Sequence, residues 1–225
     1  MSINVVERVD DLVRIQNILV SVSDKTGLDR FIPDLVKINP QIQIFSTGGT
    51  HGRLSEILDG SAGGRLMQVS DFTGQPETQG GLVKTLDFKI YLGLLTETYN
   101  DAHQKDLKRT GSVPIDMVVV NLYPFKATIS KPDVTVEQAR GNIDIGGPCM
   151  IRASAKNFIR VASVVDPADY GRIISELKEN RGSTTLKLRF ELARKAFDHT
   201  AAYDRTIADF LVSKQTGDVT NCYKL

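Results

Sequence analysis

The stretch that decides the fold is Ile115-Asp116-Met117-Val118-Val119-Val120-Asn121-Leu122. Its run of valines is typical of a strand covered on both faces, as in a parallel sheet with helices above and below. The strand ends at Tyr123-Pro124-Phe125, so Asn121 and Tyr123 are expected at its C-terminal edge, where open α/β sheets bind ligands. Taken alone, Tyr123 is explained more simply as a half-buried aromatic at that edge.

Strand-like and helix-like patterns alternate on both sides of this stretch. The sequence predicts strands at 18–22, 42–45, 65–69 and 161–165, and helices at 28–38, 50–58, 134–140, 148–156, 167–179 and 185–211. This order predicts an α/β fold, a mainly parallel sheet with helices on both faces, plus a C-terminal helical region. The 225 residues contain no internal repeat, so we expect a single domain, 1–225, with its core at about 17–212. The polar ends, before Val13 and from Thr216 onward, are expected to fray.

The composition excludes several classes of function. A formal net charge of +1 gives no global field to recruit nucleic acid or a membrane surface. The two cysteines, Cys149 and Cys222, and three scattered histidines form neither a disulfide framework nor a metal spacing. No run is apolar enough for a membrane helix, and the N-terminus does not read as a secretory signal. The expected setting is therefore the reducing cytoplasm.

Three short runs have the residues of an anion-binding turn: 21–27, 45–50 and 142–147. The first two follow strand-like stretches and precede helix-like ones, an order that exposes helix N-terminal N–H groups to an anion. Glycines allow close approach of the backbone, and the Ser and Thr hydroxyls with Lys25 complete the cradle. Glycine turns are common after strands, but two hydroxyl-rich loops in one domain predict that both bind one phosphate-bearing small molecule.

Asp144, Lys84 and Lys156 are candidates for chemistry, since each lies near glycines or the end of an element. Each also has an ordinary structural explanation: an N-cap for the aspartate, and solvated side chains for the lysines. Nothing in the sequence resembles a Ser-His-Asp triad, a Walker A loop or a full Gly-x-Gly-x-x-Gly. Nucleotide triphosphate hydrolysis and dinucleotide redox chemistry are therefore disfavoured.

Read in order, these runs resemble inosine monophosphate cyclohydrolase, the N-terminal half of the bifunctional purine-biosynthesis protein. The resemblance covers roughly residues 17 to 212. It rests on the following runs: Ser21-Val22-Ser23-Asp24-Lys25-Thr26-Gly27, Ser46-Thr47-Gly48-Gly49-Thr50, Val83-Lys84-Thr85-Leu86, Asn121-Leu122-Tyr123-Pro124-Phe125, Asp144-Ile145-Gly146-Gly147, Ala153-Ser154-Ala155-Lys156-Asn157, Lys195-Ala196-Phe197 and His199-Thr200-Ala201-Ala202-Tyr203-Asp204.

The resemblance implies a methylglyoxal synthase-like fold, a homodimer, and ring closure of 5-formamidoimidazole-4-carboxamide ribotide to inosine monophosphate without metal or organic cofactor. It implies that Asp144 orients the attacking amide or accepts its proton. Lys156 would help the formyl oxygen leave as water, with Tyr123 and Lys84 as supporting donors. The residues implied to bind the ribotide are Ser23, Asp24, Lys25, Thr47, Gly48, Gly49, Thr50, Thr85, Asn121 and Ile145.

The chain departs from the family pattern in two respects. The family usually has Arg at position 82 and His-Pro at 87–88, where this sequence has Leu82 and Asp87-Phe88. We expect Asp87 to lower the positive potential around Lys84. The second departure is length, because no transformylase half follows. The alternative function is a methylglyoxal synthase-like module that senses a purine ribotide without converting it; Asp144, Tyr123 and Lys156 favour the enzyme.

Overall fold

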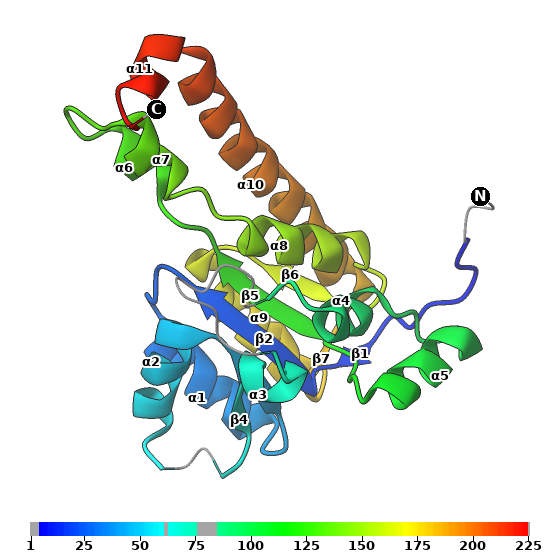
Figure 1. The fold of residues 1–225 in the computed structure, drawn as a ribbon. Coiled ribbons are helices and arrows are strands. Elements are labelled where there is room, and N and C mark those ends of the chain that lie inside the picture. The colour runs from blue at the N-terminus through cyan, green and yellow to red at the C-terminus, as the bar shows by residue number, and fades with distance from the viewer. Residues whose placement is uncertain (1–4, 61–62, 76–84, 225) are drawn as a thin grey trace.

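The computed structural model describes residues 5–60, 63–75 and 85–224. Within these ranges, five parallel strands form one sheet in the order β4-β3-β2-β5-β6 (Figure 1). Their bounds are β2 (Asn17–Val22), β3 (Gln43–Ser46), β4 (Leu66–Gln68), β5 (Met117–Asn121) and β6 (Ala162–Val164). The predicted parallel sheet is confirmed, and β5, the valine strand, lies beside β2 near its middle.

Alternate side chains of the strands enter two cores, one on each face of the sheet. From β2, Ile18, Val20 and Val22 enter the first core, while Leu19 enters the second. The first core is covered by α1 (Leu28–Ile38), α2 (Gly48–Leu58) and α9 (Tyr170–Glu179), the last preceded by the 3₁₀ turn η2 (Pro167–Asp169). The second is covered by α3 (Val69–Thr73), α4 (Phe88–Leu95) and α8 (Gly146–Lys156). Both faces are therefore covered, as the sequence predicts.

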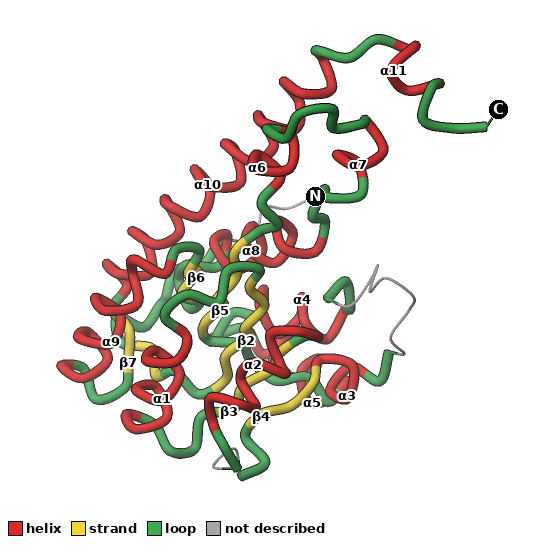
Figure 2. The backbone as a smooth tube through the Cα atoms, turned by 90° about the vertical axis from the view of Figure 1, so that its left-hand side faces the viewer, coloured by secondary structure: helices red, strands yellow, loops and turns green. Residues whose placement is uncertain are grey.

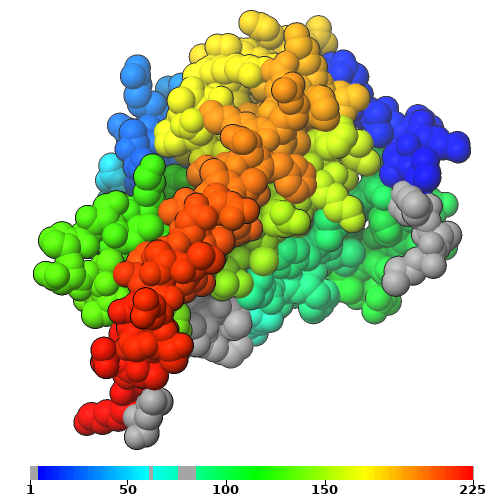
Figure 3. Space-filling model, turned by 90° about the horizontal axis from the view of Figure 1, so that it is seen from above, coloured from blue at the N-terminus to red at the C-terminus, as the bar shows by residue number. Residues whose placement is uncertain are grey.

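The long helix α10 (Leu186–Val212) packs on α8 and β6 and then continues beyond the sheet (Figure 2). Seen from above, it forms an orange-to-red ridge across the molecule (Figure 3). Its far half packs on α6 (Phe125–Ile129), which packs in turn on α7 (Val136–Arg140), and α11 (Thr216–Thr220) packs on α7. A small third core, built around Phe125, Ala139 and Phe210, lies between them. The C-terminal helical region thus packs partly on the sheet and partly on this outer cluster.

Five helices were not predicted from the sequence: α3, α4, α5 (Asp101–Thr110), α6 and α11. Both predicted frayed ends also need correction. In the tail, Gln215 and Asp218 form a capping box that starts α11. Near the N-terminus, the buried Arg189 guanidinium donates to the carbonyls of Asp10 and Asp11, at 2.7 and 3.0 Å. The next residues form β1 (Val13–Arg14), which pairs antiparallel with β7 (Ser183–Thr184).

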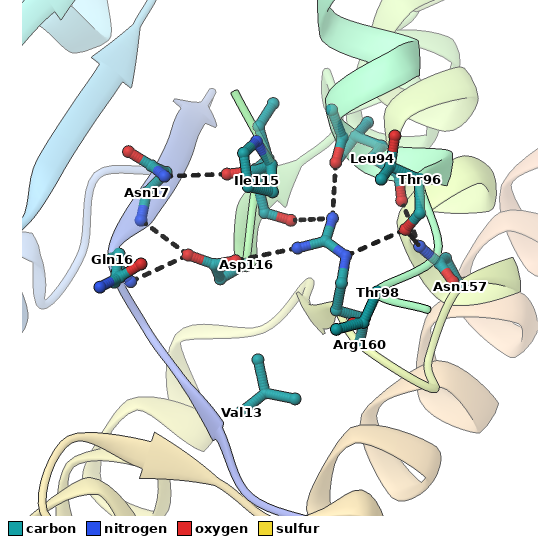
Figure 4. Close-up of polar contacts among 12 residues, drawn as sticks. Val13, Gln16, Asn17, Leu94, Thr96, Thr98, Ile115, Asp116, Asn157 and Arg160 are labelled. Atoms are coloured by element: carbon teal, nitrogen blue, oxygen red, sulfur yellow. Dashed lines mark hydrogen bonds and ion pairs between the residues drawn. The ribbon is translucent and has the colours of Figure 1, made fainter. Parts of the chain in front are cut away.

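A buried ion pair fixes the N-terminal ends of the central strands (Figure 4). The Arg160 guanidinium donates to the Asp116 carboxylate at 2.9 Å and to the carbonyl of Thr96 at 3.0 Å. The other Asp116 oxygen accepts the backbone N–H groups of Gln16 and Asn17, both at 2.9 Å. Because this end of the sheet is held by buried polar contacts, the open edge for a ligand is the C-terminal one. Within the described ranges, no helix is both long and apolar enough to cross a membrane.

Candidate active site

A cavity of about 400 Å³ opens at the C-terminal edge of the sheet, where β2, β3 and β5 end and α8 begins. Most of the residues that the sequence predicts as site residues line it together: Ser23, Lys25, Thr47, Gly48, Gly49, Thr50, Thr85, Asn121, Tyr123, Asp144 and Ile145. A cavity of this volume is in the size range of small-molecule sites. Among the described lining residues, Lys25 supplies the cationic side chain.

The loop after β2 is held by the amide of Asn121, at the end of β5. The carboxamide oxygen accepts the N–H groups of Ser23 and Asp24, at 2.7 and 2.9 Å. The Asp24 carboxylate in turn accepts the N–H and hydroxyl of Thr26, and these two hydrogen bonds lower its pKa. The sequence places Asn121 beside the base and Asp24 at the ribotide. In the structure, both side chains bond within the loop, and Asp24 does not line the cavity.

The second loop joins β3 to α2 and presents the first turn of that helix to the cavity. The Thr50 hydroxyl accepts the N–H of Val22 at 3.1 Å and donates to its carbonyl at 3.0 Å, which ties α2 to β2. The N–H groups of Gly48 and Gly49 lie in the first turn, where a helix has no carbonyl of its own to bond them. They are therefore suited to bind an anion.

Asp144 lies at the opposite wall of the cavity, in the turn that precedes α8. Its Oδ1 accepts the N–H of Gly147 at 2.9 Å. Burial raises the pKa of the Asp144 carboxyl, and the N–H groups of Gly147 and Tyr123 oppose this by stabilising the ionised form. A group with a raised pKa and few fixed hydrogen bonds is suited to accept a proton.

Gly146 and Gly147 allow this close approach. A Cβ on Gly147 would lie 2.6 Å from Asp144 Oδ2 and 2.6 Å from a methyl carbon of Leu122. A Cβ on Gly146 would lie 2.5 Å from the Thr85 hydroxyl. Only glycine therefore fits at either position without displacement of a site residue.

Tyr123 and Ile145 flank the cavity and remain more than half exposed, at 54% and 57%. Their side chains give the cavity one aromatic and one aliphatic wall, which suits a flat ring. Leu86, Ile143 and Met150 also line the cavity. These apolar residues were not predicted, since nothing in the sequence separates them from ordinary core positions.

Of the two lysines predicted as catalytic, the one that the structure describes, Lys156, is not brought together with Asp144. Lys84 lies outside the described residues. Lys156 is exposed at the last position of α8, which is about 16 Å long, so it lies at the far end of that helix from Asp144. It lines a separate cavity of about 450 Å³ with Glu97 and His103.

The unusual Asp87 has a structural role in the described part of the chain. It is only 4% exposed and is the N-cap of α4, where its carboxylate accepts the N–H of Lys89 at 2.7 Å. Aspartate is among the favoured N-cap residues, so this departure from the family pattern stabilises the start of α4.

Tyr203 contacts the Asp144 turn from outside the cavity lining, and sequence reasoning assigned it no role. It belongs to α10, and its hydroxyl accepts the backbone N–H of Asp144 at 2.8 Å. Its place in the matching run 199–204 was the one available signal, and that signal did not show what the side chain contacts.

Family profiles match two adjoining parts of the chain. The MGS-like domain matches residues 27–149, and the AICARFT/IMPCHase bienzyme matches residues 154–224. Asp144 and most of the cavity lining lie in the first match, and Tyr203 lies in the second.

Several curated proteins are similar to most of the chain. It is 48% identical to the bifunctional purine biosynthesis protein PurH of Ruminiclostridium cellulolyticum, over 88% of its length. The corresponding proteins of Bacillus subtilis and Thermoanaerobacter sp. are 48% and 50% identical, over 88% and 87%. Each match covers 37% of the relative, so the chain spans less than two-fifths of their length.

Among solved structures, the crystal structure of ForH superimposes with a TM-score of 0.73 at 30% identity. The match covers 88% of this chain and 99% of that one. Together with the profile matches and the curated relatives, it confirms the family resemblance that the sequence runs indicate.

Proposed function

The chain belongs to the MGS-like domain family, and on that premise we propose that it is an inosine monophosphate cyclohydrolase. The substrate would be 5-formamidoimidazole-4-carboxamide ribotide. The observation that carries the proposal is the position of the Asp144 carboxyl, with its raised pKa, across one cavity from two anion-binding turns. The similarity to bifunctional purine biosynthesis proteins supports it.

The phosphate would bind between the turns that follow β2 and β3. The N–H groups of Gly48 and Gly49, the dipole of α2 and the Lys25 ammonium supply the positive potential. The N–H groups of Ser23 and Asp24 are already bonded to Asn121, which holds the first loop in place beside the second. Thr47 and Ser23 contribute hydroxyls from the two loops.

The reaction joins the carboxamide nitrogen to the formyl carbon and expels the formyl oxygen as water. The two hydrogens of that water come from the carboxamide NH₂ and the formamide N–H. Asp144 accepts a proton from the attacking amide, which is otherwise a poor nucleophile. The N–H groups at the start of α8, near Ile145 and Gly146, stabilise the charge that develops on the formyl oxygen. Tyr123 donates from the facing wall, and Thr85 contacts the carboxamide.

Lys84 and Lys156 complete the proposed catalytic set. Lys84 precedes Thr85 directly in the chain and is a supporting donor. Lys156 cannot serve the Asp144 of its own chain, because α8 separates them. We therefore infer a homodimer, working in the cytoplasm, in which Lys156 of the partner subunit reaches this cavity. An antiparallel pairing of two α8 helices would bring the partner's Lys156 to this cavity. Ile145, Arg152 and Lys156 follow one another at helical spacing, and all three are exposed.

Mixing two inactive variants tests that arrangement. Asp144→Asn and Lys156→Ala chains, unfolded and refolded together, form hybrids with one intact site, which restores about a quarter of the parental activity. If both residues acted within one chain, mixing would restore nothing. Sedimentation of the parent as a monomer at micromolar concentration would also contradict the dimer.

The function itself is tested by incubation of the chain with the formylated ribotide while ultraviolet absorbance is followed for inosine monophosphate. We expect turnover without added metal. Asp144→Ala and Lys156→Ala should lower the rate about a hundredfold or more with little change in product affinity, whereas Lys25→Ala should mainly weaken binding. A parent that binds the ribotide and never closes the ring would be the sensor instead.

A further inference from the structure

We propose that Tyr203 is the positioning residue of the Asp144 carboxylate. The inference rests on the proposed cyclohydrolase activity for its kinetic consequence, although the contact itself does not depend on that activity. It assigns a function to the C-terminal segment outside the MGS-like match, since Tyr203 lies on α10 and Asp144 precedes α8.

The Tyr203 hydroxyl holds the backbone of the Asp144 turn. It accepts the N–H of Asp144 at 2.8 Å and lies 3.5 Å from the carbonyl oxygen of Asn142, toward which its proton can point. Burial raises the pKa of Tyr203, and the nearby Asp144 carboxylate raises it further. A raised pKa favours the neutral phenol, which keeps the proton needed to face a carbonyl.

Its ring packs against the segment that carries the cavity residue Tyr123. Tyr203 packs edge-on against Phe125, with ring centroids 6.2 Å apart, and Phe125 lies two residues after Tyr123. One side chain thus touches both the Tyr123–Phe125 corner and the Asn142–Asp144 turn. The distance between the proposed donor and the proposed base is set partly through Tyr203.

Contacts with its carboxylate and with its backbone therefore hold Asp144 in place. The N–H of Gly147 bonds to its carboxylate at 2.9 Å, and Tyr203 bonds to its own N–H. Because the carboxylate must meet the amide proton within hydrogen-bond reach, a small shift of the backbone lowers the rate of proton transfer. Phe210 also packs on Phe125, at 5.9 Å, but its side chain carries no polar atom and contributes packing alone.

The substitution Tyr203→Phe tests the proposal, because it keeps the ring and removes only the hydroxyl. Tyr99→Phe is the matched control, since it removes a hydroxyl bonded to Asp10, far from the cavity lining. We expect Tyr203→Phe to lower kcat about ten- to a hundredfold with KM and product affinity within about twofold. We expect Tyr99→Phe to match the parent. A loss of thermal stability in Tyr203→Phe without a selective loss of kcat would overturn the positioning role.

Amide hydrogen exchange separates this inference from the proposed function. The exchange of the Asp144 N–H should be at least about tenfold faster in Tyr203→Phe than in the parent, with β5 unchanged. This holds even for a parent that shows no turnover, in which case the cyclohydrolase proposal fails and the contact is still measured. Unchanged exchange at Asp144 would show that Tyr203 does not hold the turn.

Discussion

Asn121 and the backbone of Asp24 are joined by hydrogen bonds in both directions. The Asp24 N–H donates to the Asn121 carboxamide oxygen at 2.9 Å, and the carboxamide nitrogen donates back to the Asp24 carbonyl at 2.7 Å. With the further bond from Ser23, one side chain at the end of β5 fixes the loop that follows β2. The phosphate loop is therefore preorganised by a neighbouring strand.

Asn121→Ala should weaken nucleotide binding by about tenfold or more. The substitution removes three hydrogen bonds, and the freed N–H groups of Ser23 and Asp24 no longer hold one loop geometry, so ordering the loop opposes binding. Calorimetry with inosine monophosphate measures the effect. Asn180→Ala is the control, because among the described residues its carboxamide donates to the carbonyl of Glu176 at the end of α9 and makes no contact with the cavity lining. Equal affinities in both variants would show that the hydrogen bonds from Asn121 to the loop do not matter for binding.

Removal of the phosphate from the ligand should weaken binding far more than any change in the base. The turns at 23–25 and 47–50 both contribute to the cavity lining, and the N–H groups of Gly48 and Gly49 in the first turn of α2 need an anion. Inosine should therefore bind at least about a hundredfold more weakly than inosine monophosphate, since charge-assisted hydrogen bonds contribute about 1.5–3 kcal/mol each. Calorimetry measures the affinities for inosine and for inosine monophosphate. Equal affinities would contradict the phosphate assignment.

Gly147→Ala should abolish most turnover, whereas Gly171→Ala should not. At Gly147 a Cβ would lie 2.6 Å from the Asp144 carboxylate, while at Gly171 no atom lies within 4 Å. Gly171 lies in α9, where alanine is favoured over glycine by up to about 1 kcal/mol. Turnover and thermal unfolding of the two variants measure the difference. If Gly147→Ala kept the parental turnover, the turn before α8 would accommodate the added Cβ, contrary to our expectation.

Asp144→Asn should make the protein more stable at neutral pH while turnover is lost. Burial raises the folded-state pKa of Asp144 above the ordinary 3.8. Between those two values the folded protein binds more protons than the unfolded chain, so the free energy of unfolding falls as pH rises through that window. The amide of the Asp144→Asn variant does not titrate, so the variant avoids this fall in the free energy of unfolding. Thermal unfolding should give the variant a higher Tm than the parent at pH 7. Below pH about 3.8 the two Tm values should no longer differ.

The same raised pKa sets the acid side of the rate profile. Because the ionised Asp144 is the proposed base, kcat should fall as pH drops through its folded-state pKa, above the range of an exposed aspartate. An acid limb at the ordinary aspartate value, in a parent that closes the ring, would place the base elsewhere.

Arg160→Met should cost about 3–5 kcal/mol of stability, because it leaves the buried Asp116 carboxylate without its charged partner. For a domain of this size, each kcal/mol lowers Tm by about 2–4 °C. Arg53→Met is the control, since Arg53 pairs with Glu56 on the surface and such pairs contribute about 1 kcal/mol or less. Denaturant unfolding of the two variants should differ clearly, and equal losses would contradict the role of the buried pair.

The sheet could be predicted because its strands carry their own signal. Val118, Val119 and Val120 are buried on both faces, and only a central parallel strand places a valine run in such surroundings. Among the helices that were not predicted, α4 and α5 could not be predicted for opposite reasons. α4 is an apolar run with little helical periodicity, while α5 is polar and buries only Leu107.

At the site, the sequence predicted which runs converge but not what each side chain does. Strand ends in a parallel sheet meet at one edge, so the turns at 21–27 and 45–50 were predictable together, whereas the turn at 142–147, between α7 and α8, was placed with them by the family resemblance. Lys156 shows the limit, because it is near Asp144 in sequence and a full helix away in space. Tyr203 shows the converse, since it is 59 residues from Asp144 and bonded to it.

The bond between Tyr203 and Asp144 also has a consequence during synthesis. A ribosome releases the chain from its N-terminus, so the loops at 21–27 and 45–50 emerge well before residue 203. The sheet pairs β2 with β5 across nearly a hundred residues, and the Asp144 turn gains its anchor only once α10 has formed. A nascent chain therefore acquires its proposed phosphate loops before its proposed base is anchored, and the proposed ring closure gains its full geometry only after translation has passed α10.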